Sequence, residues 1–332
     1  MEFIFTAILV IIFFAILILG HEVGHFLAAK LLKFEVQELG FGLPPKIFGR
    51  KWRGTEYSLN AIPFGGFVRV PALDYSTEES FTIPLWKKAI VFTSGVFMNF
   101  IIAWVVFSII FMIGAPKGVY VSAIMDDSPA QIAGIEAGDK LIDFQYLAPL
   151  IDTIGNTEPG DSLTLRIERQ RKILNIIVTP VIDEGVSRSR IGVELMETGF
   201  PKEGFFQSFQ SGIETTWSFI VKIIEALIAM LRYRNFDNTA GPIEVFVAIQ
   251  VTEDMGIIYF LQLLGVVSLN LMIINLLPLP ALDGGHMLIL LVEKIRRKPI
   301  SKQLILRINS ISYSLLLLLM FVVTIRGIIR LF

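Results

Sequence analysis

The sequence contains no cysteine and only three histidines among its 332 residues. The absence of cysteine excludes disulfides, thiolate metal ligands and thiol catalysis. Charged residues make up only 18% of the chain and hydrophobic residues 54%, a balance too apolar for an ordinary soluble domain. The formal net charge is -1, so no basic excess indicates nucleic acid as a partner. Any histidine-dependent metal site must draw on His21, His25 and His286.

Four apolar runs are long enough to cross a bilayer, which takes about 20 residues. They cover 3–32, 88–114, 257–292 and 304–325. The first run has no basic segment before it and no small-residue cleavage site after it, so it predicts a retained helix rather than a signal peptide. The predicted fold class is a multi-pass α-helical membrane protein with four transmembrane helices, and its surroundings are the lipid bilayer.

A fifth candidate helix, 205–231, has a different pattern. Its polar residues recur at intervals of three and four and form one stripe: Gln207, Gln210, Glu214, Ser218, Lys222 and Glu225. This pattern favours an amphipathic helix that lies at the membrane interface. The alternative is a membrane-buried helix with a polar inner face.

Basic residues gather in two of the connections, 33–88 and 293–303. The positive-inside rule predicts that both lie on the cytoplasmic side. With four spans, both termini and the long 115–256 region then lie outside the cytoplasm.

The runs and connections predict four parts. Residues 1–114 form an N-terminal membrane part, in which the Gly- and Pro-punctuated stretch 40–70 contains two β-like runs and predicts a membrane-associated β-hairpin. Residues 115–182 alternate short β-like runs with turns and predict a small β domain. Residues 183–256 are predicted to be a linker that includes the amphipathic helix, and 257–332 a C-terminal membrane part.

The motif His21-Glu22-Val23-Gly24-His25 lies near the end of the first apolar run. Residues i and i+4 share one face of a helix, so both imidazoles can reach one metal ion. Glu22 can then act as a general base on water, the arrangement typical of metalloproteases. Two imidazoles, a third protein ligand and an open position suit Zn²⁺. Polar residues emerging at the interface are the alternative, but that position does not require this spacing.

The third ligand is predicted to be Asp283, the only acidic residue between Asp254 and Glu293. Two prolines break the helix before it, and two glycines after it allow close approach of the backbone. Broken helices at membrane depth mark binding sites. A helix-capping role for Asp283 is the alternative. His286 is the rival ligand. The interpretation favoured for His286 is that it supports the site without binding the metal.

These residues resemble the site-2 protease family of intramembrane zinc metalloproteases, in the PDZ-containing, RseP-like bacterial branch. The resemblance rests on the His21–His25 motif, the Asn275–Gly285 stretch with Leu282-Asp283-Gly284, and the Asn60–Val70 segment. Ser128-Pro129-Ala130 and Ala133–Asp139 resemble bacterial PDZ signatures, and Ala240–Ile243 resembles another family element. The resemblance covers nearly the whole chain.

The resemblance implies a metalloendopeptidase that cuts within or near transmembrane segments. His21, His25 and Asp283 would bind Zn²⁺, and Glu22 would be the catalytic base. Asn275 and the hairpin residues Ile62, Pro63, Phe64, Gly65 and Gly66 would bind an extended substrate. The implied substrates are single-span membrane proteins, such as anti-sigma factors and remnant signal peptides, in the bacterial cytoplasmic (inner) membrane, with the active site near the cytoplasmic side and the PDZ-like domain outside.

Some residues depart from the family pattern. Only one PDZ-like domain fits in 115–182, and 145–155 contains no convincing peptide-binding loop. The domain could still act as a size filter that blocks bulky extracytoplasmic domains from the site, because that role requires only its bulk. Two other classes of function use the same residues: a membrane metal transporter or sensor, and a catalytically silent PDZ scaffold. A transporter requires a polar path to both sides of the membrane, and a silent scaffold does not require Glu22.

Overall fold

The computed structural model describes residues 2–73, 82–158, 160–169, 172–182, 188–233, 242–298 and 300–331. The chain forms two compact units. The first consists of Met1–Phe107, Gly212–Ile249 and Gln262–Phe332, and the second of Ser108–Ser211 and Gln250–Leu261.

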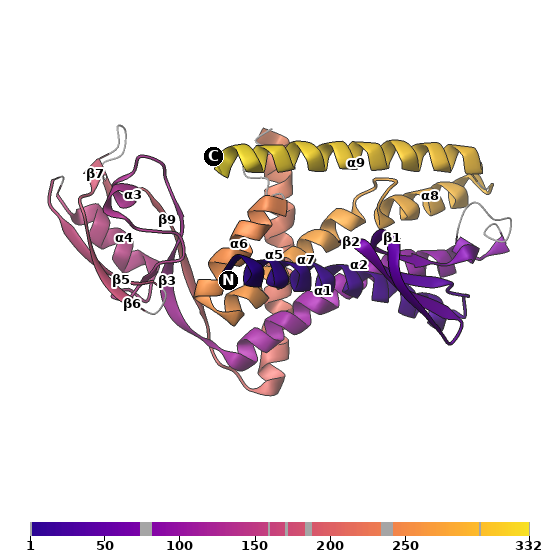
Figure 1. Ribbon diagram of the computed structural model, residues 1–332, viewed down its shortest axis with the longest axis horizontal. Coiled ribbons are helices and arrows are strands. Elements are labelled where there is room, and N and C mark those ends of the chain that lie inside the picture. Colours follow the sequence, from indigo (N-terminus) through magenta and orange to yellow (C-terminus); the bar gives the residue numbers. More distant parts are fainter. Residues whose placement is uncertain are drawn as a thin grey trace. The chain divides into compact units, whose positions relative to one another are not determined.

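Long apolar helices dominate the first unit (Figure 1). They are α1 (Glu2–Leu31), α2 (Leu85–Ile113), α7 (Ile257–Leu276) and α9 (Lys302–Leu331). Among the described residues, these four helices contain the segments long and apolar enough to cross a membrane: Thr6–Leu31, Leu85–Ile113, Ile257–Leu276 and Gln303–Ile329. The chain is therefore a membrane protein, as its composition predicts.

The predicted third span, 257–292, is interrupted, as its two prolines predict. Helix α7 ends at Leu276, and α8 (Asp283–Arg296) begins after an irregular segment that contains Pro278 and Pro280. A Cβ atom on Gly284 would lie 2.3 Å from the Leu276 carbonyl oxygen, so only glycine lets the start of α8 fold back against the end of α7. This fold-back fixes the position of Asp283.

The predicted hairpin is present as β1 (Glu38–Trp52) and β2 (Thr55–Arg69), which pair antiparallel. The pairing is more elaborate than a simple hairpin, because Leu39 pairs with both Tyr57 and Val68. The first residues of β1 thus lie between two segments of β2. Among the described residues, the segment 66–69 pairs with β1 on one side only, and it forms an outer edge of this sheet.

A buried carboxylate holds the hairpin together at its base. The Glu38 side chain is 7% exposed and accepts a hydrogen bond from the Ser58 hydroxyl at 2.7 Å. Lys46 Nζ lies 3.1 Å from Oε1 and Arg69 Nη1 lies 3.4 Å from Oε2. Burial by itself would raise the pKa of Glu38, but the Ser58 hydroxyl, Lys46 and Arg69 outweigh it and lower the pKa. The stabilisation is therefore present at neutral pH and is lost as pH falls through the lowered pKa.

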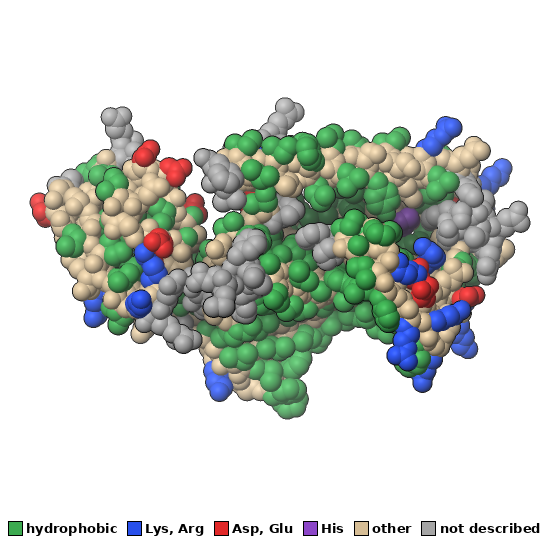
Figure 2. All heavy atoms as spheres, in the orientation of Figure 1, with side chains coloured by type: hydrophobic (Ala, Val, Ile, Leu, Met, Phe, Trp, Pro, Cys, Tyr) green, Lys and Arg blue, Asp and Glu red, His purple; other side chains and the backbone are tan. Residues whose placement is uncertain are grey.

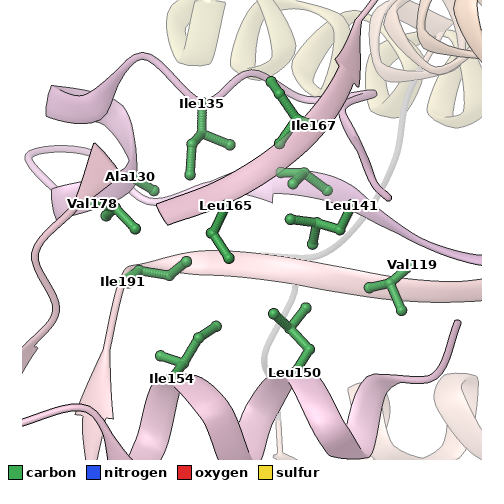
Figure 3. Close-up of a cluster of buried hydrophobic side chains, with 11 residues drawn as sticks. Val119, Ala130, Ile135, Leu141, Leu150, Ile154, Leu165, Ile167, Val178 and Ile191 are labelled. Atoms are coloured by element: carbon green, nitrogen blue, oxygen red, sulfur yellow. The ribbon is translucent and has the colours of Figure 1, made fainter. Parts of the chain in front are cut away.

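The second unit contains a five-stranded sheet in the order β6-β5-β4-β3-β9. Its strands are β3 (Ala115–Ile124), β4 (Lys140–Leu141), β5 (Leu163–Arg169), β6 (Lys172–Val178) and β9 (Val193–Phe200), with β7 (Val181–Ile182) and β8 (Ser189–Arg190) paired separately. Helices α3 (Pro129–Ala133) and α4 (Leu147–Asn156) complete it. Figure 3 shows its core, in which Leu150 and Ile154 of α4 pack with Leu165 and Ile167 of β5.

The predicted boundary of this domain at residue 182 is too early. Strand β9 lies in the segment predicted to be a linker, yet Val121 of β3 pairs with Leu195 of β9. Its partner strand is about 70 residues earlier in the chain, a non-local pairing that a local pattern does not reveal.

The predicted amphipathic helix is present as α5 (Phe205–Tyr233), and it is not among the candidate spans. Thr216 and Ile220 are buried, and the ring of Phe219 stacks on Phe107 of α2 at 5.2 Å. Helix α6 (Pro242–Met255) follows it. Of the predicted family element at 240–243, residues 240 and 241 lie outside the described residues.

Loss of Asp139 should destabilise the second unit strongly. Its carboxylate is 1% exposed, accepts hydrogen bonds from Arg169 at 2.7 Å, and accepts another from the backbone N–H of Glu136 at 2.8 Å. Asp139→Ala leaves Arg169 without its buried partner, which costs about 3 kcal/mol. The measurement is the urea concentration at which a protease cuts this unit within the full-length protein. Asp143→Ala, which removes a 32% exposed partner of Arg166, should cost less than about 1 kcal/mol; equal effects would contradict this assignment.

Candidate active site and metal centre

Three potential metal ligands converge from two helices of the first unit. His21 and His25 lie one turn apart on α1, and Asp283 is the first residue of α8. Asp283 Oδ2 lies 3.2 Å from Nε2 of His21 and 3.4 Å from Nε2 of His25. The three ligand atoms lie within 4.8 Å of one another, and they form the one group of this kind found among the described residues.

The chemistry of these atoms suits a cation. His25 Nδ1 lies 2.7 Å from the Val91 carbonyl oxygen and donates its proton there, so Nε2 presents a lone pair. The two Nε2 atoms are only 3.1 Å apart. Asp283 Oδ2 is shielded from solvent and has no hydrogen-bond partner. Two imidazole nitrogens and a buried carboxylate oxygen that face one point are satisfied together by a zinc ion.

Asn99 of α2 supports His21. Its amide nitrogen lies 3.3 Å from His21 Nδ1, and its Oδ1 is buried without a partner. A rotation of the Asn99 amide by about 180° would place Oδ1 where it accepts the Nδ1 proton of His21. The rotation satisfies Oδ1 and leaves His21 Nε2 free for a metal. Neither Asn99 nor Val91 was singled out from the sequence.

Two glycines allow the parts of the site to come together. A Cβ atom on Gly95 of α2 would lie 2.3 Å from His25 Nε2 and 2.7 Å from His21 Cε1. A Cβ atom on Gly66 of β2 would lie 2.7 Å from Glu22 Cγ. The edge of the hairpin sheet thus passes directly beside Glu22.

His21, Glu22, His25, Gly66 and Asp283 line a cavity of about 600 Å³. One wall is formed by the outer-edge residues 66–70 of the hairpin, and others by Asn275, His286 and residues of α9. Figure 2 shows a histidine side chain in a recess among hydrophobic side chains, with Lys and Arg side chains gathered nearby. The cavity therefore places ligating, basic and polar groups inside an otherwise apolar helical unit.

The structure brings most of the predicted site residues to this cavity. His21, Glu22, His25, Asn275, Asp283, His286 and Gly66 all line it. His286 stacks on Phe92 at 4.7 Å, and it is not in the group of converging ligand atoms.

The predicted substrate-binding stretch 62–66 is only partly at the cavity. Ile62 pairs with Leu43 of β1 and Gly65 has a φ of +107°, and neither is among the lining residues. The side chains of Pro63 and Phe64 lie outside the described residues. Of the predicted stretch, Gly66 lines the cavity, and the lining continues through 67–70.

Two histidines and an aspartate that converge in a unit of apolar helices, with a glutamate beside them, are the arrangement typical of an intramembrane metalloprotease. The family comparison is in agreement: the model of peptidase family M50 matches residues 9–319. The chain belongs to peptidase family M50, the site-2 protease family. Zinc is the cofactor expected for it.

The chain is also similar to curated bacterial proteins over nearly its full length. A Clostridium perfringens protein, named as a zinc metalloprotease, is 32% identical over 95% of this chain and 96% of that protein. The regulator of sigma-W protease RasP of Bacillus subtilis is 26% identical over 99% of this chain and 100% of that protein. The regulator of sigma E protease of Haemophilus influenzae is 24% identical over 94% of this chain and 95% of that protein.

Asn99→Leu should weaken zinc binding by about 10- to 100-fold, the usual effect of losing a hydrogen bond that orients a ligating histidine. Asn99→Asp should restore most of the affinity, because a carboxylate oxygen also accepts the Nδ1 proton of His21. The measurement is zinc retention against a graded series of chelator concentrations. A loss that is the same in both variants would contradict the assigned hydrogen bond.

Proposed function

We propose that His21, His25 and Asp283 bind the catalytic zinc ion and that Glu22 is the general base. The observation that carries the proposal is the convergence of the α1 motif with Asp283, which is more than 250 residues away in the chain, at a cavity edged by a β-strand. When bound, zinc supplies Lewis acidity, which lowers the pKa of water and polarises a carbonyl group.

The residues of this chain handle the proton and the peptide. Glu22 takes a proton from the attacking water and gives it to the leaving amine, so one carboxylate serves both steps. His25 and His21 are held in the metal-binding tautomer by Val91 and Asn99. His286 lines the same cavity and is proposed to support the site rather than bind the ion.

The outer edge at 66–69 is proposed to hold the substrate in an extended form. A helical substrate hides its carbonyl groups in its own hydrogen bonds, so it must unwind before hydrolysis. The unpaired edge of β2 offers replacement backbone hydrogen bonds by β-augmentation. Asn275 lines the cavity and is proposed to bind the substrate backbone as well.

The substrates are proposed to be single-span membrane proteins of the cytoplasmic membrane. Two similar proteins are named as regulators of sigma W and sigma E, which supports membrane-bound anti-sigma factors as candidates, and remnant signal peptides have the same single-span chemistry. The basic connections support an active site near the cytoplasmic side, with the second unit outside as a PDZ-like size filter. Helix α5 is proposed to lie at the interface.

The test is a cleavage assay with purified protein and a single-span substrate, followed by mass spectrometry of the products. We expect one or a few cuts within or next to the apolar segment, abolished by a zinc chelator and restored by zinc. A metal transporter would instead move zinc across proteoliposomes without any cut. Absence of products from several unrelated single-span substrates would overturn the proposed function.

A further inference from the structure

Helix α9 contributes a polar group to the cavity that the mechanism above does not use. Asn309 and Tyr313, one turn apart, both line the cavity that contains the metal-binding atoms. Much of α9 is apolar, above all the run 315–323, and none of its most apolar window is buried by the protein. Asn309 and Tyr313 therefore place polar groups on the part of α9 that lines the cavity.

Among the residues that the structure describes, the side-chain oxygen of Asn309 has no hydrogen-bond partner. Oδ1 is shielded from solvent and makes no hydrogen bond. An amide group buried without a partner costs about 1–3 kcal/mol, so a residue that served only to attach α9 would be expected to have one. By contrast, Ser314 of the same helix is satisfied locally, because its hydroxyl donates to the Ser310 carbonyl oxygen.

A bound substrate strand would present unpaired backbone groups that the Asn309 amide can pair with. One edge of an extended peptide pairs with the 66–69 edge of β2, but its other edge presents unpaired N–H and C=O groups. Inside an apolar unit, these groups must be satisfied by the walls of the cavity. An asparagine amide offers a carbonyl oxygen as acceptor and an NH2 group as donor, the same two kinds of group that a peptide unit presents.

From these observations we infer that Asn309 is a substrate-positioning residue that binds the backbone of the extended peptide on the edge opposite to β2. The inference rests on the proposed protease function and extends it. The substrate is thereby held from two sides, by a strand on one edge and by an asparagine amide of α9 on the other. Recognition of backbone rather than side chains suits an enzyme that accepts apolar segments of varied sequence.

The test compares Asn309→Leu with wild type on a single-span substrate and on semisynthetic versions in which one backbone amide near the cut, but not the scissile one, is an ester. Asn309→Leu should lower kcat/KM about tenfold, the value of one buried hydrogen bond, with zinc content unchanged. An ester at one position should cost wild type about tenfold. On that ester substrate, Asn309→Leu should cause no further loss, because the same hydrogen bond is already absent.

Ser310→Leu is the matched control, because Ser310 is the exposed neighbour and is not among the cavity-lining residues. It should leave kcat/KM unchanged. Equal activity of Asn309→Leu and wild type, or an equal loss on every substrate together with loss of zinc, would overturn the inference. Both results require an active wild type, so neither can be mistaken for failure of the proposed function, which would leave wild type without products.

Discussion

Glu22→Gln should reduce the rate of peptide hydrolysis by about 10²- to 10⁴-fold while the protein keeps its zinc. Glutamine has nearly the same shape as glutamate but cannot accept a proton from water. Glu22 is not among the three converging ligand atoms, and the glycine at position 66 leaves equal room for either side chain. The measurement is the initial rate of product formation from a single-span substrate, with zinc per chain determined on the same sample.

Glu22→Asp is the matched control, because it keeps the carboxylate and withdraws it by one methylene. It should retain more activity than the glutamine variant, since the loss is then one of position rather than of chemistry. If Glu22→Gln cleaves as fast as wild type, Glu22 is not the base and the proposed mechanism is wrong.

Gly95→Ala should remove zinc from the protein, although residue 95 binds nothing itself. The added methyl group would lie 2.3 Å from His25 Nε2, a distance that two such atoms do not reach. Either the imidazoles turn away from Asp283, or α2 moves outward and takes the Val91 carbonyl with it. We expect zinc affinity to fall by at least about 100-fold, the upper end of what the loss of a supporting hydrogen bond causes. The measurement of this loss of affinity is the zinc content of the protein after dialysis against a chelator.

Gly20→Ala tests whether the effect is specific to the metal centre. Its added Cβ atom also meets the facing helix, at 2.2 Å from Ile102 Cδ1. That atom is the end of a flexible side chain, which can change rotamer at a cost of about 1 kcal/mol. This variant should keep its zinc; a loss as large as that of Gly95→Ala would mean that any crowding between α1 and α2 disrupts the site.

The convergence of His21, His25 and Asp283 was predictable from the sequence, because each of the two segments that carry them is encoded locally. A four-residue spacing on a helix places His21 and His25 on one face whatever surrounds them. Pro278 and Pro280 break a helix wherever they occur, and so they indicate that Asp283 follows an interruption. The two segments then converge if they reach the same depth in the membrane.

The remainder depends on contacts between distant segments. The position of Gly95 against the two histidines follows from the relative placement of α1 and α2, which no local pattern shows. A signal was nevertheless present, since Asn99 lies one helical turn after Gly95 in an apolar helix, where polar residues are costly. The double pairing of Leu39 and the pairing of β9 with β3 are also non-local. For that reason the sequence does not show that the cavity is lined by 66–70 or that β9 pairs with β3.

Zinc retention in Asp283→Ala and His286→Ala tests the central claim most directly, namely that α1 and α8 share one metal ion. Both residues line the cavity, but only Asp283 has an atom within 3.4 Å of the two histidine nitrogens. We expect wild type and His286→Ala to retain one zinc ion per chain after dialysis against a chelator, and Asp283→Ala to lose it. Retention by Asp283→Ala together with loss from His286→Ala would contradict the proposed site.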